Sequence, residues 1–573
     1  MPSNKYDVAI IGSGLAGSLT ALYLQQQQPH LSIALLGEPA SKRPIVGESL
    51  TEFSTMFLHE LGLTDHLEQE HFHKYGLSFY FKETTGGGQY AMHEAPAIPP
   101  IPSNMLNRTV FDEKLNERIS ESEVERFPVR VKDVDLVDDD SHRVHLKTGE
   151  EIDAKWLIDC SGRNRFLVRK LGLGTKPRHQ RSCFWFRMNN FDRSLLDSIP
   201  QVKQKQHCFD SYYVTHHFMG KGNWIWLIPM RDSDGKQTMS VGIVYRPDLV
   251  PAHIRSMEQF SEQIENEHPE LAEFLQSGSV VDTNSYSNYM YGTSQLYSSN
   301  RWAVIGDAGL TVDPLYSTGI VMNAIQIKQV EVMIAADQKN ELSKEAIDQF
   351  QSIFFAMHEG LQNEISNLYE VMDDPYQCQW RVHFASSFYF YFLLPCWLNG
   401  YMLTPNGIRF MLKVIEDGQR KVMSLNQLLS QASKEKGPIS TLDLPNRYSS
   451  SVNWKLWGPD ESKLKGYLQQ LTQSFICYRL EILKDAGWKH LMQHSQFLSL
   501  DALNYVGLKI LQLARIPVVR NARHEQSATE CNVNQQKKLT GPTMSHNDRR
   551  KSKQRKKQPN IFSPSPLRQT NSN

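Results

Sequence analysis

The sequence predicts an α/β fold in three parts: a parallel-sheet domain that opens the chain, a second β-sheet region, and a C-terminal, mostly helical region. Three observations predict it. The chain opens with a strand, a glycine-rich turn and a helical pattern; strands of alternating polarity recur within residues 176–295; and residues 340–520 repeat apolar side chains at spacings of three and four. A chain of 573 residues exceeds one ordinary core, so several structural units are expected.

The first element is a strand that passes through glycines into a helix, in the opening stretch KYDVAIIGSGLAGSLTALYLQQQ. Gly12 allows a tight turn, Gly14 lets the backbone approach a pyrophosphate, and Gly17 lets the helix pack on the strand. Around Leu15 and Ala16 the first N–H groups of the helix would face the phosphates. This context predicts a Rossmann-type domain that binds a dinucleotide.

A second strand, LSIALLGE, fits the same domain. It ends at Glu38, 21 residues after Gly17, where a carboxylate would bind ribose hydroxyl groups. Much later, the stretch NRWAVIGDAGLTVDPLYSTGI again runs from a strand into a glycine turn, at Gly306 and Asp307. NAD alone would not need this second turn.

Together these stretches resemble FAD oxidoreductases related to hydroxybenzoate hydroxylase. RTVFDEKL, with Arg108, is similar to their Arg-x-x-Phe-Asp element, and LIDCSGRNRFL, with Asp159 and Gly162, to their Asp-x-x-Gly turn. In that superfamily the late Gly-Asp holds the ribityl and phosphate groups, and here Pro314 follows it. The resemblance implies a discontinuous FAD-binding domain made of residues 1–50, 100–175 and 296–335.

The stretch GNWIWLIPM places two of the chain's ten tryptophans one residue apart. Period two puts Trp224 and Trp226 on one face of a strand, and Pro229 ends it or marks an edge. Alone, such a pair is a sheet core face. However, WIWLIP also matches the Trp-x-Trp-x-Ile-Pro motif of the flavin-dependent halogenases. That resemblance implies that both tryptophans wall off a tunnel between flavin and substrate.

Two further stretches are similar to elements of that family. VGES, with Gly47, Glu48 and Ser49, resembles the segment that covers the flavin. DPLYSTGI resembles the family's Pro-Leu-Glu-Ser-Thr-Gly-Ile stretch, which binds halide beside the flavin through backbone amides. The amides in question are those of Thr318 and Gly319, where a helix is expected to begin and to favour an anion. Ser317, one position earlier, is a candidate catalytic residue.

Lys74, in HKYGLSFYF, resembles the family's essential lysine in its Lys-x-Gly-x-x-Phe element. The resemblance implies that reduced FAD and O2 form a C4a-hydroperoxide, which halide attacks to give hypohalous acid. The lysine then hydrogen-bonds this oxidant or forms a haloamine, and directs it at an electron-rich carbon. A surface role for Lys74 stays open, with Lys82 as the alternative lysine; the neighbouring His73 is either structural or a proton-transfer group.

Two positions depart from the pattern. Tyr316 stands where tryptophan halogenases have a glutamate, so free tryptophan is not the expected substrate; phenol- and pyrrole-type members have an aromatic residue there. Thr311 stands where many phenolic members have phenylalanine.

The remaining segments complete the predicted architecture. Residues 51–99 and 176–295 form the substrate-side sheet region, and residues 336–520 form helices that cap the substrate pocket. Residues 385–403 lack charge, but their proline, glycine and central aromatics favour a buried lining over a membrane span. Candidates for that lining are Phe388, Tyr389, Phe392 and Trp397.

Composition bounds the other functions. Seven scattered cysteines without a Cys-x-x-Cys pair indicate neither a metal site nor disulfides, and suit the cytoplasm. The net charge is zero and nothing suggests nucleic acid. Residues 521–573 are expected to be a disordered basic tail, because ten Lys or Arg face one acid between Lys537 and Arg568.

The sequence therefore predicts a two-component, FADH2-dependent halogenase that installs chloride or bromide on an electron-rich aromatic or heteroaromatic substrate, free or tethered to a carrier protein. Because no second dinucleotide motif is evident, reduced flavin would come from a separate flavin reductase. Two alternatives stay open: a monooxygenase of the same fold that hydroxylates or epoxidises, and a non-catalytic FAD-binding scaffold.

Overall fold

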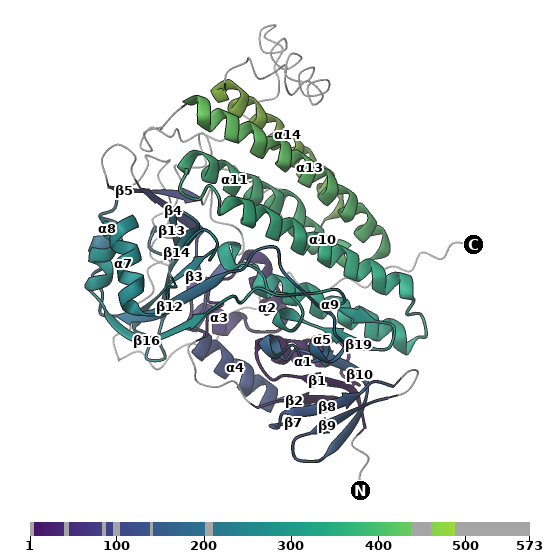
Figure 1. Cartoon of the computed structure of the whole chain (residues 1–573). Coiled ribbons are helices and arrows are strands. Elements are labelled where there is room, and N and C mark those ends of the chain that lie inside the picture. Colours follow the sequence, from purple (N-terminus) through teal and green to yellow (C-terminus); the bar gives the residue numbers. More distant parts are fainter. Residues whose placement is uncertain are drawn as a thin grey trace, which may run out of the picture.

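A computed structural model describes residues 5–38, 45–82, 88–94, 103–137, 141–200, 210–251, 253–436 and 460–486. Two sheets lie side by side, and a layer of long helices covers them (Figure 1). The α/β fold class predicted from the sequence is confirmed. The predicted basic tail, residues 521–573, lies outside the described residues.

The first sheet holds the opening strand at its centre. Its main path runs β18-β19-β10-β1-β2-β7, and β8 joins through β9 to β10. The pairs of β1 with β2 and β10, of β10 with β19 and of β2 with β7 are parallel. The strands are β1 (Lys5–Ile11), β2 (Ile33–Leu36), β7 (Glu125–Phe127), β8 (Val131–Asp135), β9 (His142–Leu146), β10 (Glu151–Asp159), β18 (Tyr297–Ser298) and β19 (Trp302–Val304).

Both faces of this sheet are buried, which explains the continuous apolar run from Val8 to Ile11. Val8 and Ile10 pack into the core beneath the helices on one face, whereas Ala9 and Ile11 face β8, β9 and a short helix on the other. The helices on these faces are α1 (Leu15–Gln27), α4 (Arg108–Ser120), α5 (Phe166–Lys170) and α9 (Gly319–Gln338).

The second sheet is mainly antiparallel, in the order β16-β12-β15-β14-β13-β4-β5, with β13 and β4 parallel. β4 and β5 come from residues 51–99, and the other strands come from residues 176–295. The strands are β4 (Leu77–Lys82), β5 (Gln89–Glu94), β12 (Ser182–Asn189), β13 (Thr215–Gly220), β14 (Asn223–Arg231), β15 (Gln237–Tyr245) and β16 (Ser279–Tyr286).

The two faces of β14 serve different surroundings. Ile225 and Leu227 pack beneath α7 (Met257–Glu267) and α8 (Pro269–Gln276), whereas Trp224 and Trp226 point to the opposite face, toward the rest of the molecule. Pro229 lies inside β14 and pairs with Met239 on β15, so the prediction that the strand ends at this proline is wrong. Pairing of β14 with β13 stops at Leu227, so at Pro229 the strand is paired on one side only, as the alternative of an edge position predicts.

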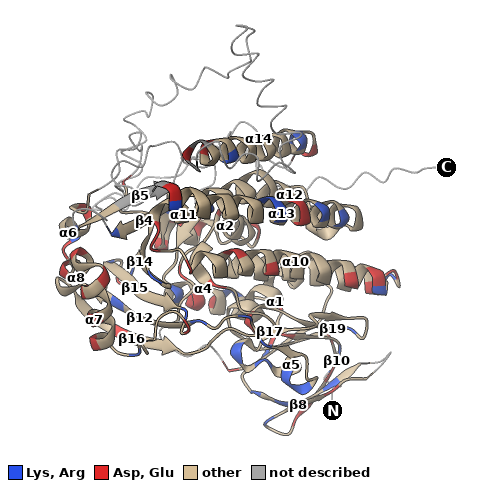
Figure 2. Ribbon diagram, turned by 45° about the horizontal axis from the view of Figure 1, so that its top comes forward, with Lys and Arg blue, Asp and Glu red and all other residues tan. Residues whose placement is uncertain are grey.

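The helical layer consists of long helices beside a short irregular segment. The helices are α10 (Lys344–Leu368), α11 (Pro375–Phe388), the π-helix η4 (Tyr389–Leu393), α12 (Leu394–Leu398), the 3-10 turn η5 (Tyr401–Leu403), α13 (Pro405–Lys436) and α14 (Glu461–Ala486). In Figure 2 acidic and basic residues are interspersed along these helices. Within the described ranges, none of the helices is long and apolar enough to cross a membrane.

Short elements connect the two sheets. β3 (Phe72–Lys74) pairs antiparallel with β6 (Ser103–Met105), so that Lys74 lies opposite Ser103. The other short elements are α2 (Glu52–Glu60), α3 (Thr64–Glu70), α6 (Arg193–Asp197), β11 (Gly174–Thr175), β17 (Gly292–Thr293), and the 3-10 turns η1 (Gly162–Asn164), η2 (Gly306–Ala308) and η3 (Pro314–Tyr316).

Gly242 on β15 makes room for one of the two tryptophans. It lies directly opposite Trp226 on β14, and a Cβ atom at this position would overlap the Trp226 indole ring. A rigid, buried ring cannot give way as a flexible side chain does, so the strand needs a glycine here.

We expect Gly242→Ala to lower the free energy of unfolding by about 1–3 kcal/mol, because the added methyl overpacks the sheet. Gly174→Ala is the control, since a Cβ there would meet no atom closer than 3.8 Å. Urea titration of both variants measures the effect. Equal stability of the Gly242→Ala variant and the native protein would show that the indole moves freely.

Candidate active site

A long cavity of about 1200 Å³ runs from the glycine turn of the first domain to the tryptophans of the second sheet. It exceeds the roughly 300–1,000 Å³ of pockets for ordinary small ligands, as a dinucleotide requires. Nearly all residues predicted to bind the cofactor line it: Gly12, Gly14, Leu15, Ala16, Glu38, Gly47, Glu48, Ser49, Arg108, Gly306, Asp307 and Pro314. Gly17 does not line it.

The glycines at this turn have the properties that a pyrophosphate site needs. Gly12 has φ +105°, which disfavours other residues, and a Cβ on Gly17 would overlap the Gly12 carbonyl oxygen. Gly14, in contrast, has open space where a Cβ would stand. The turn therefore brings α1 close to β1 and leaves the first N–H groups of α1 facing the cavity, so the residues fit a dinucleotide.

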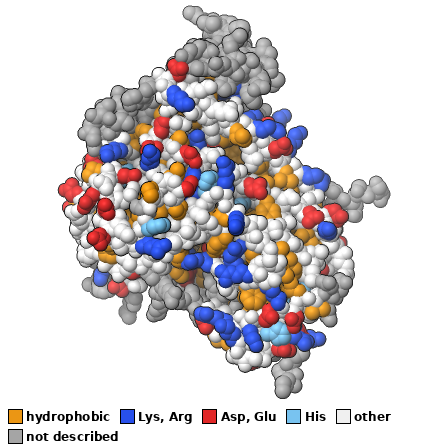
Figure 3. All heavy atoms as spheres, in the orientation of Figure 1, with side chains coloured by type: hydrophobic (Ala, Val, Ile, Leu, Met, Phe, Trp, Pro, Cys, Tyr) orange, Lys and Arg blue, Asp and Glu red, His pale blue; other side chains and the backbone are white. Residues whose placement is uncertain are grey.

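Basic side chains at one part of the cavity were not predicted from the sequence. Arg130, Lys132 and Lys147 line it, and Arg130 pairs with the exposed Glu38 carboxylate at 2.8 Å. Basic side chains also gather on the lower part of the face shown in Figure 3, where the first domain lies. No motif marks these residues in the sequence, because only the fold brings Arg130, which precedes β8, to Glu38 after β2.

Arg108 shapes the turn that carries Gly47, Glu48 and Ser49, called here the GES segment. Its guanidinium donates to the Val46 carbonyl oxygen at 2.7 Å and to both carboxylate oxygens of Asp112. Gly47 has φ +98°, and a Cβ there would come within 2.9 Å of the Arg108 guanidinium. Arg108 thus holds the backbone of this turn in place at the wall of the cavity.

A buried hydrogen-bond chain joins the GES segment to a tryptophan. The Trp226 indole N–H donates to Ser240 Oγ at 3.1 Å, and the Ser240 hydroxyl donates to Glu48 Oε2 at 2.6 Å. Burial raises the pKa of Glu48 to about 7, although the Ser240 hydrogen bond and the nearby Arg187 and Arg108 oppose the shift.

The other tryptophan is held from the helical layer. The Trp224 indole N–H donates to the Tyr369 hydroxyl at 2.8 Å, and Tyr369 in turn donates to Asp313. The two indole rings lie 5.9 Å apart between centroids, and both line the long cavity. Both therefore have their polar N–H groups satisfied and cannot turn away without losing a buried hydrogen bond.

His217 is a cavity residue that sequence reasoning missed. It stacks on Phe79 at 5.0 Å and lies 5.5 Å from the Trp224 ring, and its Nδ1 is buried without a partner. Burial, together with the charge of Lys74, lowers its pKa to about 3. No motif or spacing in the sequence marks this histidine, because its contact with Phe79 depends on the parallel pairing of β13 with β4.

The DPLYSTGI stretch forms a tight turn between the cavity and α9. Ser317 adopts the left-handed conformation, with φ 57° and ψ 34°, and its N–H donates to the Pro314 carbonyl oxygen. α9 begins at Gly319, so the first free N–H groups of that helix follow the turn. Ser317 and Gly319 line the long cavity, whereas Thr318 lines a second one and has a buried hydroxyl without a partner.

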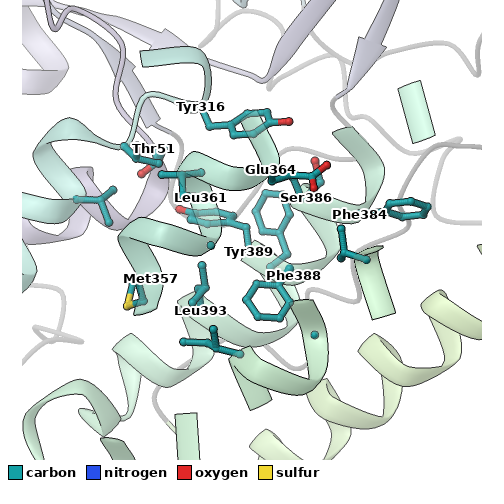
Figure 4. A pocket seen from close by; sticks show the side chains of 18 of the residues that line it. Thr51, Tyr316, Met357, Leu361, Glu364, Phe384, Ser386, Phe388, Tyr389 and Leu393 are labelled. Carbon is teal, nitrogen blue, oxygen red and sulfur yellow. The ribbon is translucent and has the colours of Figure 1, made fainter. Parts of the chain in front are cut away.

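This second cavity, of about 480 Å³, lies beneath the helical layer and is mostly apolar (Figure 4). Its lining comes from α2, α9, α10, α11, η4 and α13, and includes Tyr316, Phe388 and Tyr389. Phe392 and Trp397, also proposed as lining, are not among its lining residues. Phe392 is fully buried in the core, and Trp397 packs on Phe53 with ring centroids 3.8 Å apart.

Lys74 lies where the two cavities meet. Its buried ammonium donates to Ser49 Oγ at 3.0 Å and to the Leu50 carbonyl oxygen at 2.7 Å. Lys74 lines the second cavity, Ser49 lines the long one, and Met322 lines both. Burial lowers the pKa of Lys74 to about 8, opposed by the negative field of Glu52.

The other residues weighed with Lys74 lie elsewhere. Lys82 is exposed at the far end of β4 and donates to the Asn266 carbonyl oxygen. His73 is half-buried beside Asn104 and lines neither cavity. Thr311 lines the long cavity and accepts from the Tyr291 N–H. In the described part of the chain, no group of three potential metal ligands occurs.

The parallel sheet, the glycine turn and the long cavity define a nucleotide-dependent oxidoreductase fold, and comparison with known proteins specifies its kind. Residues 101–383 match the tryptophan halogenase family, and residues 7–182 match the lycopene cyclase protein family. Flavin-dependent halogenase chlA of Dictyostelium discoideum is 30% identical over 495 residues, 79% of this chain and 78% of that protein. A chlorinase of 1H-pyrrole-2-carbonyl-peptidyl-carrier protein from Pseudomonas fluorescens is 28% identical over 397 residues, 65% of this chain and 83% of the relative.

Solved structures agree on the fold. The halogenase PltM superposes with a TM-score of 0.61 at 18% identity, over 81% of this chain and 96% of PltM. The brominase Bmp2 superposes with a TM-score of 0.55 at 19% identity, over 73% of this chain and 99% of Bmp2. The chain belongs to the flavin-dependent halogenase family and is thus an FAD-dependent oxidoreductase. The resemblance drawn from its motifs is confirmed.

Glu48 makes stability depend on pH. Its pKa is about 7 in the folded protein and about 4.3 in an unfolded chain. Because the folded pKa is the higher of the two, the contribution of Glu48 to the free energy of unfolding is fully present below about pH 4.3. It is lost as pH rises through about 7.

We therefore expect the free energy of unfolding of the native protein to fall by on the order of 3 kcal/mol, relative to that of Glu48→Gln, between about pH 5 and pH 8. The amide oxygen can still accept the Ser240 hydrogen bond. Urea unfolding of both proteins across this range measures the difference, and parallel curves would refute the assignment.

Proposed function

We propose that this protein is a two-component, FADH2-dependent halogenase that installs chloride or bromide on an electron-rich aromatic or heteroaromatic substrate. The position of Lys74 carries the proposal: it is a buried amine between a dinucleotide-sized cavity and an apolar second cavity. A separate reductase would supply reduced flavin. The substrate is either free or tethered to a carrier protein, as the name of the pyrrole chlorinase states for that relative.

The long cavity would hold FAD. Its pyrophosphate would lie at Gly12, Gly14 and the start of α1, its ribose near Glu38, and its flavin half toward the GES segment and the tryptophans. When reduced, FAD with O2 supplies the oxidant that converts halide to hypohalous acid. The backbone N–H groups of Thr318 and Gly319 would bind the halide, because they lie at the start of the 20-residue helix α9.

Trp224 and Trp226 would keep the aromatic substrate apart from the flavin. Both indoles are buried and tied by hydrogen bonds, so together they form a rigid wall of the long cavity. A small oxidant such as hypohalous acid can pass where an aromatic ring cannot. The wall thus favours halogenation over direct hydroxylation.

Lys74 would hold the oxidant at the substrate. Its hydrogen bonds fix its position, and a pKa of about 8 leaves a share of neutral amine near neutral pH. The ammonium can donate to the hypohalous oxygen, and the amine can form a haloamine. Either form places the halogen in the second cavity, next to an aromatic ring held by Phe388 and Tyr389.

The first test is mass spectrometry of phenols, pyrroles and indoles incubated with the protein, FAD, a flavin reductase, NADH and bromide. We expect a bromine isotope doublet on at least one ring, absent without the protein. A gain of one oxygen without bromine would contradict the proposal and establish a monooxygenase.

Lys74→Ala tests the central residue. We expect halogenation of the substrate to fall by about a hundredfold or more, because the oxidant loses its guide, whereas FAD binding and hypohalous acid formation persist. A chemical trap for hypohalous acid measures the second quantity. Lys82→Ala is the matched control and should retain native halogenation; native activity in Lys74→Ala would refute the assignment.

A further inference from the structure

The second cavity contains a carboxylate that none of the motifs predicts. Glu364 on α10 lines this cavity together with Tyr316, which precedes the halide turn, and Asn426 on α13. Figure 4 shows Glu364 and Tyr316 in the same lining, reached from different elements. Position 316 is where tryptophan halogenases have their glutamate, so here a carboxylate enters the same space from α10.

Glu364 is only partly satisfied by the protein. Asn426 Nδ2 donates to Glu364 Oε2 at 3.2 Å, while Glu364 Oε1 is buried without a hydrogen-bond partner. The Tyr316 hydroxyl is likewise buried without a partner. Buried polar atoms are nearly always hydrogen-bonded, so two unpartnered ones in the lining of one cavity point to a ligand that pairs with them.

The surroundings favour a neutral partner with a donor group. Burial raises the pKa of Glu364, although the field of the buried Arg381 opposes the shift. The walls around it are apolar and aromatic, including Leu361, Phe384 and Phe388. An aromatic ring with a hydroxyl group fits both the apolar walls and the carboxylate. The ring packs on the walls, and the O–H donates to the carboxylate.

We infer that Glu364 recognises a phenolic hydroxyl of the substrate, so that the substrate class is a weakly acidic hydroxyarene. This inference rests on the proposed halogenase function. The substrate O–H donates to Glu364 Oε1, and the Tyr316 hydroxyl donates to the same substrate oxygen. The ring then lies in the cavity that Lys74 also lines.

The same contact would activate the ring. Glu364 takes the phenolic proton, and the electron pair left on oxygen increases electron density at the ortho and para carbons. One of these carbons forms the bond to halogen while the halogen–oxygen bond of hypohalous acid breaks, and the departing hydroxide takes a proton from the Lys74 ammonium to give water. The ring carbon loses its proton to the Lys74 amine, and Glu364 returns its proton to the phenolic oxygen.

Binding tests this without turnover. FAD-loaded protein, without reductant or halide, is titrated in a calorimeter with resorcinol and other hydroxyarenes, each paired with its methyl ether. We expect the native protein to bind the hydroxyarene roughly tenfold to a hundredfold more tightly than the ether, because the ether leaves the carboxylate unpaired. Glu364→Leu, which removes both acceptor oxygens, should lose most of this preference. Tyr316→Phe should weaken the binding of both ligands alike, because the ether oxygen also accepts from the tyrosine hydroxyl.

Glu359→Leu is the matched control, because Glu359 is an exposed carboxylate on the same helix outside the cavity lining. It should retain the native preference. Thermal melts check that each variant is folded. Equal preference in Glu364→Leu and native protein, or no binding of any hydroxyarene to native protein, would overturn the inference. Failure of the halogenase proposal would appear separately, as an absence of halogenated product from native protein.

Discussion

The buried ion pair between Arg181 and Asp313 is the interaction on which the arrangement of the site depends. The Arg181 Nε donates to Asp313 Oδ2 at 2.7 Å, and the two side chains are 1% and 0% exposed. Arg181 immediately precedes β12 of the second sheet, whereas Asp313 begins the turn after the first sheet. Removing one partner of such a pair would leave an uncompensated buried charge, which costs about 3–5 kcal/mol. The pair thus fixes the second sheet relative to the turn that follows the first sheet.

The helical layer is joined to the same pair through Tyr369, at the end of α10. The Arg181 guanidinium lies 4.2 Å from the centre of the Tyr369 ring, and the Tyr369 hydroxyl donates to Asp313 and accepts from Trp224. Asp313 also accepts from the Leu315 N–H and so holds the turn that leads to Ser317. One carboxylate therefore fixes both a tryptophan of the wall and the turn proposed to bind halide. A displacement of α10 would be transmitted to both.

Sequence reasoning located the parts of the site that are local in the chain. Gly12, Gly14 and Gly306 could be predicted because a strand, a turn and a helix follow one another within a few residues. The partners that hold these parts could not, because they are distant: Tyr369 is 145 positions from Trp224, and Glu48 is 192 positions from Ser240. The lining of the second cavity was predicted only in part for a different reason. The π-helix η4 (Tyr389–Leu393) inserts a residue into the helical register, so Phe392 turns into the core while Phe388 stays at the cavity.

The linings of the two cavities differ in the way that the proposed chemistry requires. A bound flavin needs polar and basic contacts, which the long cavity offers, whereas an aromatic ring needs the apolar walls beneath α10, α11 and α13. Lys74 can stand between them only because its charge is compensated. Glu52 raises its pKa against the effect of burial, and the Tyr389 hydroxyl donates to Glu52 at 3.1 Å. Tyr389 belongs to the π-helix, so the irregular turn that removes Phe392 from the cavity also supplies the hydroxyl that orients the counter-charge of the lysine. The same five-residue turn therefore contributes both to the lining of the second cavity and to the hydrogen bonding of Glu52 beside Lys74.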